Sequence, residues 1–217
     1  MVGSDIEAIG LLQDPVRRRL YDYVAAQEHD VGRNEAAEAA GVQRTLAAFH
    51  LDRLAEAGLL DTVYRRLSGK SGPGAGRPAK LYRRAVEEYA VSLPPRDYRT
   101  AAGLLAEAAE EVRADGELGA AAHRDGVAAG QAARDLPLTD LLAARGYEPV
   151  AGDDGAIRLR NCPFHQLAEQ FPPLVCGMNL ALLEGLLEGA EQDYRARMAA
   201  KPGWCCVVLE NSKNNED

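Results

Sequence analysis

Cysteines are few in this chain of 217 residues, and long apolar runs are absent from it. It has four cysteines, and no uninterrupted apolar run reaches the roughly 18 residues that suggest a membrane span. No N-terminal apolar segment of the signal-peptide kind stands out, so we expect a cytoplasmic protein without membrane contact. In a reducing cytoplasm, cysteines gathered in one region are more often metal ligands or redox centres than structural disulfides.

Acidic residues are missing from residues 64–84, although the whole chain has a formal net charge of -8. The acidic excess lies in residues 91–217, which hold 20 Asp/Glu against 12 Lys/Arg. The basic residues of the acid-free stretch are Arg65, Arg66, Lys70, Arg77, Lys80, Arg83 and Arg84. A local excess of positive charge of this kind is typical of a surface that meets a polyanion, which makes the stretch a candidate nucleic-acid contact.

The first part of the chain has the apolar spacing of three helices. Asp14 is placed to cap the first of them, with Pro15 at its first helical position. The second covers RNEAAEAAGV, with Asn34 as its cap and Gly41 at its end. The third lies in QRTLAAFHLDRLAEAGLL, whose apolar residues at helical spacing are Leu46, Phe49, Leu51, Leu54 and Leu60.

Two β-rich segments follow, DTVYRR and AKLYRR, separated by a glycine-rich loop. Helices followed by a two-stranded hairpin with a basic tip predict a winged helix-turn-helix domain over residues 1–90. In such a domain the third helix enters the major groove of DNA with its first side chains on base edges. The residues that we expect to contact DNA are Gln43, Arg44, Thr45, His50, Arg53, Arg65, Arg66, Lys70, Arg77 and Lys80.

The segments DPVRRRLYDYV, AAEAAGVQRTLAAFHLDRLAEAGLL and GRPAKLY resemble winged-helix bacterial repressors of the broad ArsR-like and DeoR-like kind. The resemblance implies a homodimer on double-stranded operator DNA, because two recognition helices must meet half-sites about 34 Å apart. A winged helix that binds protein instead of DNA is the alternative.

Residues 91–146 predict a helical linker that also serves in dimerisation. They are rich in alanine, glutamate and arginine. Their apolar residues are sparse and include Leu104, Leu105, Val112 and Leu118. A helix that packs only on its own chain is nearly as compatible with this pattern.

Residues 147–210 predict an α/β sensor domain with a small antiparallel sheet, which makes the whole chain an α+β protein. YEPVA and AIRLRN flank the turn GDDG as a hairpin. HQLAEQF and LVCGMNLALLEGLLEGA read as helices separated by Pro172-Pro173, and WCCVVLE reads as a final strand. Residues 211–217 are polar and are expected to be disordered.

The four cysteines fall in three of these predicted elements. Cys162 ends a strand, Cys176 lies near the start of a helix, and Cys205 and Cys206 lie in the final strand. Their spacing resembles no CxxC zinc knuckle, so a shared site depends on tertiary structure. Because successive strand residues point to opposite faces, at most one of Cys205 and Cys206 is expected to join the other two cysteines. Three converging thiolates suit either a zinc ion or an iron–sulfur cluster.

The CP at residues 162–163, the VCG at 175–177 and the GWC at 203–205 resemble the SufR-type iron–sulfur repressors, as does their position after a winged helix. The resemblance implies that Cys162, Cys176 and Cys205 ligate a [4Fe-4S] or [2Fe-2S] cluster. It leaves the fourth ligand open. His165 is the nearest candidate, and Cys206 is its rival.

We therefore expect a transcriptional regulator that senses redox or iron–sulfur status. The alternative is the same type of repressor with a zinc site, a small-molecule effector pocket or merely structural cysteines in its C-terminal domain. An enzyme that pairs Cys162 or Cys176 with His165 or His123 is not expected, since no orienting third residue and no phosphate-binding GxxxxGK motif accompanies them.

Overall fold

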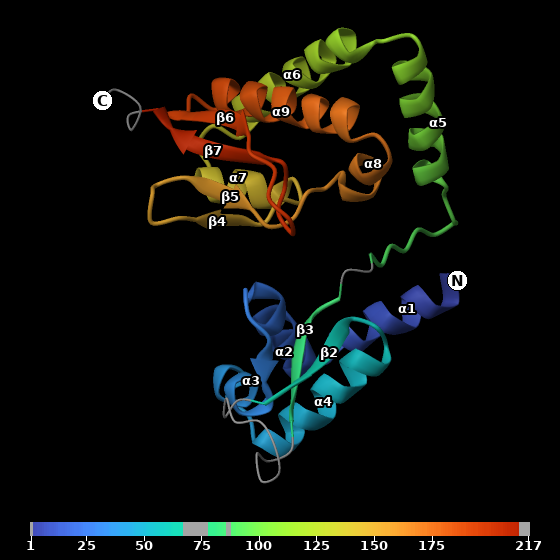
Figure 1. The fold of residues 1–217 in the computed structure, drawn as a ribbon, viewed down its shortest axis with the longest axis vertical. Coiled ribbons are helices and arrows are strands. Elements are labelled where there is room, and N and C mark those ends of the chain that lie inside the picture. The colour runs from blue at the N-terminus through green and yellow to red at the C-terminus, as the bar shows by residue number, and fades with distance from the viewer. Residues whose placement is uncertain (1, 67–77, 86–87, 213–217) are drawn as a thin grey trace. The chain divides into compact units, whose positions relative to one another are not determined.

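The computed structural model describes residues 2–66, 78–85 and 88–212. The chain divides into two compact units, Met1–Arg96 and Asp97–Asp217 (Figure 1). Each unit combines helices with a small antiparallel sheet, which confirms the predicted α+β class. Among the described residues, no helix has the length and apolarity of a membrane-spanning segment.

The first unit consists of helices around a three-stranded sheet. Its helices are α1 (Val2–Gly10), α2 (Pro15–Ala26), α3 (Arg33–Ala40) and α4 (Arg44–Glu56), with the 3-10 turn η1 (Leu11–Gln13) after α1. Its strands are β1 (Val31–Gly32), β2 (Leu60–Arg65) and β3 (Ala79–Arg84), in the antiparallel order β1-β3-β2. Residues 67–77, which include most of the predicted glycine-rich tip, lie outside the described residues.

Local sequence signals set most of the helix ends in this unit. The carboxylate of Asp14 caps α2 as predicted and accepts two backbone N–H groups of the first turn at 2.9 and 3.0 Å. Gly41 ends α3 as predicted, with φ 66° in the left-handed region. The predicted cap Asn34 is wrong: Gly32 is the N-cap of α3, and its N–H donates to the carboxylate of Glu35 at 3.3 Å.

The core of the first unit lies between α2, α3, α4 and the sheet. Its fully buried side chains include Leu20, Val24, Val31, Leu51, Leu54 and Tyr82. Leu46 and Phe49 were predicted to share the apolar face of the third helix, but they are 42% and 60% exposed. The helical period explains the difference, because Ala47, Leu51 and Leu54 point inward one turn apart and leave Phe49 on the opposite side.

The second unit packs five helices and a four-stranded sheet. The helices are α5 (Tyr98–Glu111), α6 (Asp115–Ala132), α7 (Leu138–Ala144), α8 (His165–Gln170) and α9 (Pro172–Gly189). The strands are β4 (Pro149–Ala151), β5 (Ile157–Leu159), β6 (Tyr194–Met198) and β7 (Val207–Asn211), in the antiparallel order β4-β5-β7-β6. The predicted hairpin is confirmed as β4 and β5, and the two proline residues open α9.

Helix α6 lies beside the second half of α9 (Figure 1). The two helices run in the same direction, since Gly119 near the start of α6 faces Ala181 in the middle of α9, and Gly130 near the end of α6 faces Gly189 at the end of α9. Four glycines make the contact, Gly126 and Gly130 on α6 and Gly185 and Gly189 on α9. A Cβ added to any of the four would overlap backbone atoms of the facing helix.

The predicted linker of residues 91–146 differs from what the structure contains. Helices α6 and α7 are part of the core of the second unit, because the glycines of α6 pack on α9 and α7 contributes the buried Leu138, Leu141 and Leu142. In the predicted disordered tail, Asn211 ends β7 and the N–H of Ser212 donates to the carbonyl of Asp193 at 3.0 Å. Residues 213–217 lie outside the described residues.

Candidate functional site

The start of α4 presents several of the predicted DNA contacts on the surface of the first unit. Gln43 is the N-cap residue, and Arg44 and Thr45 form the first turn. All three are exposed. Arg53 lies on the exposed side farther along the helix, 3.8 Å from the carboxylate of Glu56. These side chains are therefore accessible to a partner.

His50 is not accessible in this way. Its side chain is only 7% exposed, and its Nδ1 has no hydrogen-bond partner among the described residues. The prediction that His50 contacts DNA is therefore wrong, because its side chain is buried in the first unit. The reason is again the helical period, which turns His50 inward together with Ala47, Leu51 and Leu54.

The basic residues of the two strands differ in their surroundings. Arg65 lies 3.3 Å from the carboxylate of Asp30, and Lys80 lies 2.7 Å from that of Asp52. Arg66 is exposed directly after β2. The predicted contacts Lys70 and Arg77 lie outside the described residues.

Asp52 joins α3, α4 and β3. Its carboxylate accepts hydrogen bonds from Arg33 at 3.0 and 3.2 Å, from Lys80 at 2.7 Å and from the hydroxyl of Tyr82 at 2.6 Å. Burial raises the pKa of Asp52, but these donors outweigh it and the net pKa is lowered. Burial together with the bond to Asp52 raises the pKa of Tyr82 to about 12. The Asp52 cluster thus holds β3 against α4, with two cations around one carboxylate.

All four thiols of the chain meet in the second unit. The thiols of Cys162 and Cys206 both lie close enough to Cys205 to shift its pKa, and Cys176 in turn affects the pKa of Cys206. Cys205 is buried, the other three are partly buried, and none is in a disulfide. The four thus form a chain of pairwise interactions, which we call the thiol cluster. No group of three or more potential metal ligands among the described residues is arranged as a ready metal site.

Two predictions about the ligand set are corrected by these positions. Strand β7 begins at Val207, so Cys205 and Cys206 lie in the loop before it, after a turn in which Gly203 has φ 78°. The alternation of strand side chains does not apply there, and both cysteines join the cluster. His165, the predicted nearest fourth ligand, instead lies 3.3 Å from the carboxylate of Glu169 with a largely exposed side chain.

A buried polar pair supports the thiol cluster and was missed in the sequence. Asn179 is fully buried, and its side-chain amide donates to Sγ of Cys205 at 3.3 Å. The hydroxyl of Tyr147, also buried, donates to Oδ1 of Asn179 at 2.5 Å. In the sequence, this pair could have been recognised from Asn179, a polar residue inside the apolar helical segment, one turn after Cys176.

The hydrogen bonds concentrate negative charge on Cys205. Bonds from Cys162, Cys206, the Val207 N–H and Asn179 lower the pKa of Cys205, and the bond from Cys162 has the largest effect. The interaction with Cys205 raises the pKa of Cys162 and of Cys206, and burial raises both further. Cys205 is therefore the thiol that ionises first, at the centre of the cluster.

Comparisons of the chain with models of protein families, with curated proteins and with solved structures find no match.

Proposed function

We propose that this protein is a DNA-binding transcriptional regulator, acting as a repressor, with a metal-binding sensor in its second unit. The observation that carries this proposal is that the chain's four cysteines, which come from three separate segments, meet in one unit. The other unit presents an exposed helix start beside a basic strand pair.

The first unit supports DNA binding through a winged helix-turn-helix arrangement. Helix α3, the turn at Gly41 and α4 are followed by the antiparallel strands β2 and β3, which is the order of that fold. Arg44 and Thr45 would reach base edges, and Arg53 and Arg66 would contact the phosphate backbone. Helix α4 carries two acids: Asp52 is neutralised by two cations, and Glu56 lies 3.8 Å from Arg53.

Substituting Arg44 tests this surface. Arg44→Ala should weaken binding to a labelled duplex enriched from a random-sequence pool by about 1–3 kcal/mol, because a base-edge contact would be lost. The measurement is fluorescence anisotropy at fixed salt, since phosphate contacts make affinity salt-dependent. Arg195→Ala, an equal charge change on exposed β6, is the control. If both variants weakened DNA binding equally, the affinity would depend only on net charge. That result would contradict a role of α4 in contacting base edges.

The exposed side of α5 supports a homodimer. Its apolar residues follow a spacing of three and four, as in a coiled-coil seam, and are Tyr98, Ala101, Leu105, Ala108 and Val112. The three large ones are 72–75% exposed, which is unusual for a stripe of this length.

The charges of α5 favour a second copy of the same helix in antiparallel orientation. Arg99 lies near its start, and Glu107, Glu110 and Glu111 lie near its end. Both placements oppose the helix dipole, which prefers acids at the start and bases at the end. An antiparallel copy would bring the basic end of one helix to the acidic end of the other.

Leu105→Glu should convert such a dimer to a monomer, because it places a charge at the centre of the seam on each side. Sedimentation velocity of the wild type and the variant measures this. A wild type that sediments as a monomer at tens of micromolar would refute the dimer, and an unchanged dimer in the variant would place the interface elsewhere.

The thiol cluster fits a thiolate-bound metal centre by its donor chemistry. Cys162, Cys176, Cys205 and Cys206 would hold it. Backbone N–H groups of Phe164 and Val207 act to lower the pKa of two of the sulfurs, and hydrogen bonds to sulfur tune iron–sulfur centres. An iron–sulfur cluster, when bound, supplies a redox-active group that is lost when iron is scarce. We propose this cofactor for the site.

Zinc is the second candidate, because four neighbouring thiolates are a donor set that structural zinc sites use. A tetrahedral zinc site with Zn–S bonds of about 2.3 Å brings its sulfurs close to contact, whereas an iron–sulfur core separates them. Iron, acid-labile sulfide and zinc measured on anaerobically purified protein distinguish the two. A sensor also requires that the metal-loaded and metal-free forms differ in DNA affinity, which the anisotropy assay measures.

A further inference from the structure

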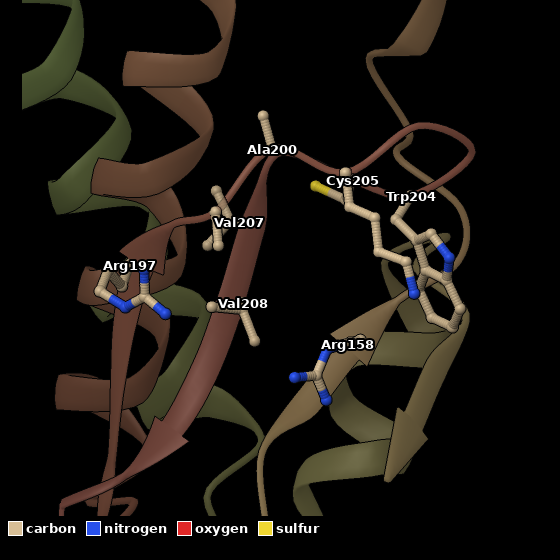
Figure 2. Close-up of a pocket in the computed structure, with 9 residues that line it drawn as sticks. Arg158, Arg197, Ala200, Trp204, Cys205, Val207 and Val208 are labelled. Atoms are coloured by element: carbon tan, nitrogen blue, oxygen red, sulfur yellow. The ribbon is translucent and has the colours of Figure 1, made fainter. Parts of the chain in front are cut away.

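A pocket of about 240 Å³ lies over strands β5, β7 and β6 of the second unit (Figure 2). Three of its lining residues are basic, Arg158, Arg197 and Lys201. Trp204 and Cys205 also line it. None of the described residues that line it is acidic.

The sheet register places the two arginines on one face. Arg158 of β5 and Arg197 of β6 are both paired with Val208 of the strand between them. With strands about 4.8 Å apart, the backbones of the two arginines lie roughly 10 Å from each other, with an apolar residue between them. Figure 2 shows both guanidinium groups and Val208 at the pocket.

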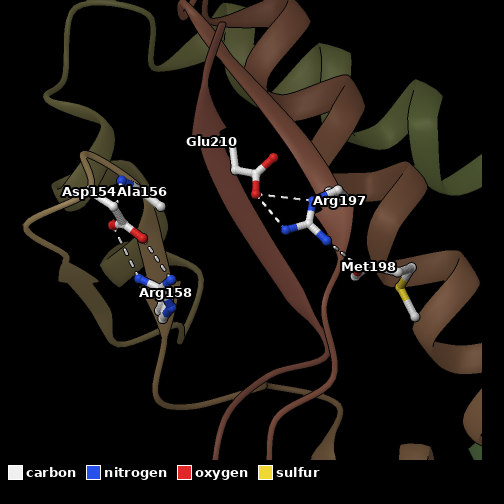
Figure 3. Close-up of polar contacts among 6 residues, drawn as sticks. All are labelled: Asp154, Ala156, Arg158, Arg197, Met198 and Glu210. Carbon is white, nitrogen blue, oxygen red and sulfur yellow. Dashed lines mark hydrogen bonds and ion pairs between the residues drawn. The ribbon is translucent and has the colours of Figure 1, made fainter. Parts of the chain in front are cut away.

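Each arginine is held by a carboxylate that does not line the pocket (Figure 3). Both terminal nitrogens of Arg158 donate to Asp154, at 3.3 and 2.8 Å. Nε of Arg197 donates to Glu210 at 3.0 Å. These bonds fix the orientation of the guanidinium groups and leave further N–H donors on Arg158, since a guanidinium has five.

Lys201 and Trp204 complete the rim. Nζ of Lys201 lies 4.9 Å from the centroid of the Trp204 ring, a cation–π contact that holds the ammonium over the indole. Among the described residues, no carboxylate pairs with Lys201. The pocket therefore combines an apolar floor with three cations, two of which are paired with carboxylates outside it, so that Lys201 supplies the unbalanced positive charge.

We propose that this pocket binds a small organic anion bearing carboxylate or phosphate groups. Arg158, Arg197 and Lys201 would hold the anionic groups, and Val208 and Trp204 would contact the body of the ligand. Planar guanidinium groups suit such acceptors because they donate two parallel hydrogen bonds. Cys205 in the pocket wall also belongs to the thiol cluster, so the ligand would cover one side of that cluster. The proposal does not depend on DNA binding or on a metal.

Trp204 makes the test direct, because it is the only tryptophan of the chain and lies in the pocket. Its fluorescence is followed while the full-length protein is titrated separately with citrate and with inorganic phosphate, at ionic strength held constant with NaCl. We expect a saturable change with at least one probe. Citrate alone indicates a carboxylate ligand, and phosphate alone indicates a phosphorylated one.

Arg158→Gln/Arg197→Gln should weaken the binding at least tenfold, whereas Arg195→Gln, on β6 but outside the lining residues, should leave it unchanged. Lys201→Gln, an exposed single change, gives a second reading if the double variant does not fold by circular dichroism. No saturable change with either citrate or phosphate, or equal affinities in wild type and pocket variants, would overturn the proposal.

Discussion

Gly185→Ala should destabilise the second unit by about 3 kcal/mol or more, the upper range for overpacking. The added Cβ would overlap the carbonyl oxygen of His123 and lie 2.9 Å from its carbonyl carbon. These are backbone atoms, so no change of rotamer relieves the overlap. Helices α6 and α9 would have to separate and lose their contact along the whole interface.

Urea unfolding followed by Trp204 fluorescence measures this loss, because the single tryptophan reports the second unit. Gly177→Ala is the matched control, since it lies in the same helix and nothing stands within 4 Å of its added Cβ. Alanine there should be neutral or stabilise by about 0.5–1 kcal/mol, the usual gain in a helix interior. The same midpoint shift in both variants would contradict a backbone-to-backbone interface.

Cys205→Ser should abolish metal binding, with the metal content of anaerobically purified protein falling at least tenfold. Cys205 is the thiol whose pKa its surroundings lower, and Cys162 and Cys206 both contribute to that shift. Serine keeps the size of the side chain but ionises far less readily than a thiol, so it is a poor ligand for iron or zinc.

Two further variants decide the fourth ligand. Cys206→Ser should also lose metal, because Cys206 connects Cys176 to the rest of the cluster. His165→Ala should keep it, because His165 faces Glu169. Metal lost from His165→Ala but kept in Cys206→Ser would reverse this assignment. Unchanged metal content in Cys205→Ser would remove the thiol cluster as the metal site.

Elements with strong local signals were predictable from the sequence. The cap at Asp14, the left-handed Gly41 and the hairpin around GDDG each depend on a few neighbouring residues, and all three are confirmed. The burial of His50 was not predicted. The apolar face of the third helix was assigned to a stripe that included Leu46 and Phe49, whereas the side that faces the core carries Ala47, Leu51 and Leu54. Small residues carry little weight in an apolar pattern.

The thiol cluster was predictable only in part. The meeting of Cys162, Cys176 and Cys205 was expected, but Cys206 was only the rival of His165 for the fourth place, because the final strand was predicted to begin at Trp204 and β7 begins three residues later. The pairing of α6 with α9 depends on four glycines, which have no side chains. Glycines do not contribute to the apolar periodicity from which packing faces are predicted, so this pairing was not predicted. The repeated GxxxG spacing at 126–130 and 185–189 was the available clue.

The glycine contact also determines how α9 can respond to events at its other end. Cys176 lies nine residues before Gly185, which is about 14 Å along the helix axis. Where backbones touch directly, no side chain between them can change rotamer and absorb a displacement. A displacement of α9 at Cys176 would therefore move α6 together with α9. In this way a change at the thiol cluster would be transmitted to α6, the helix that follows α5.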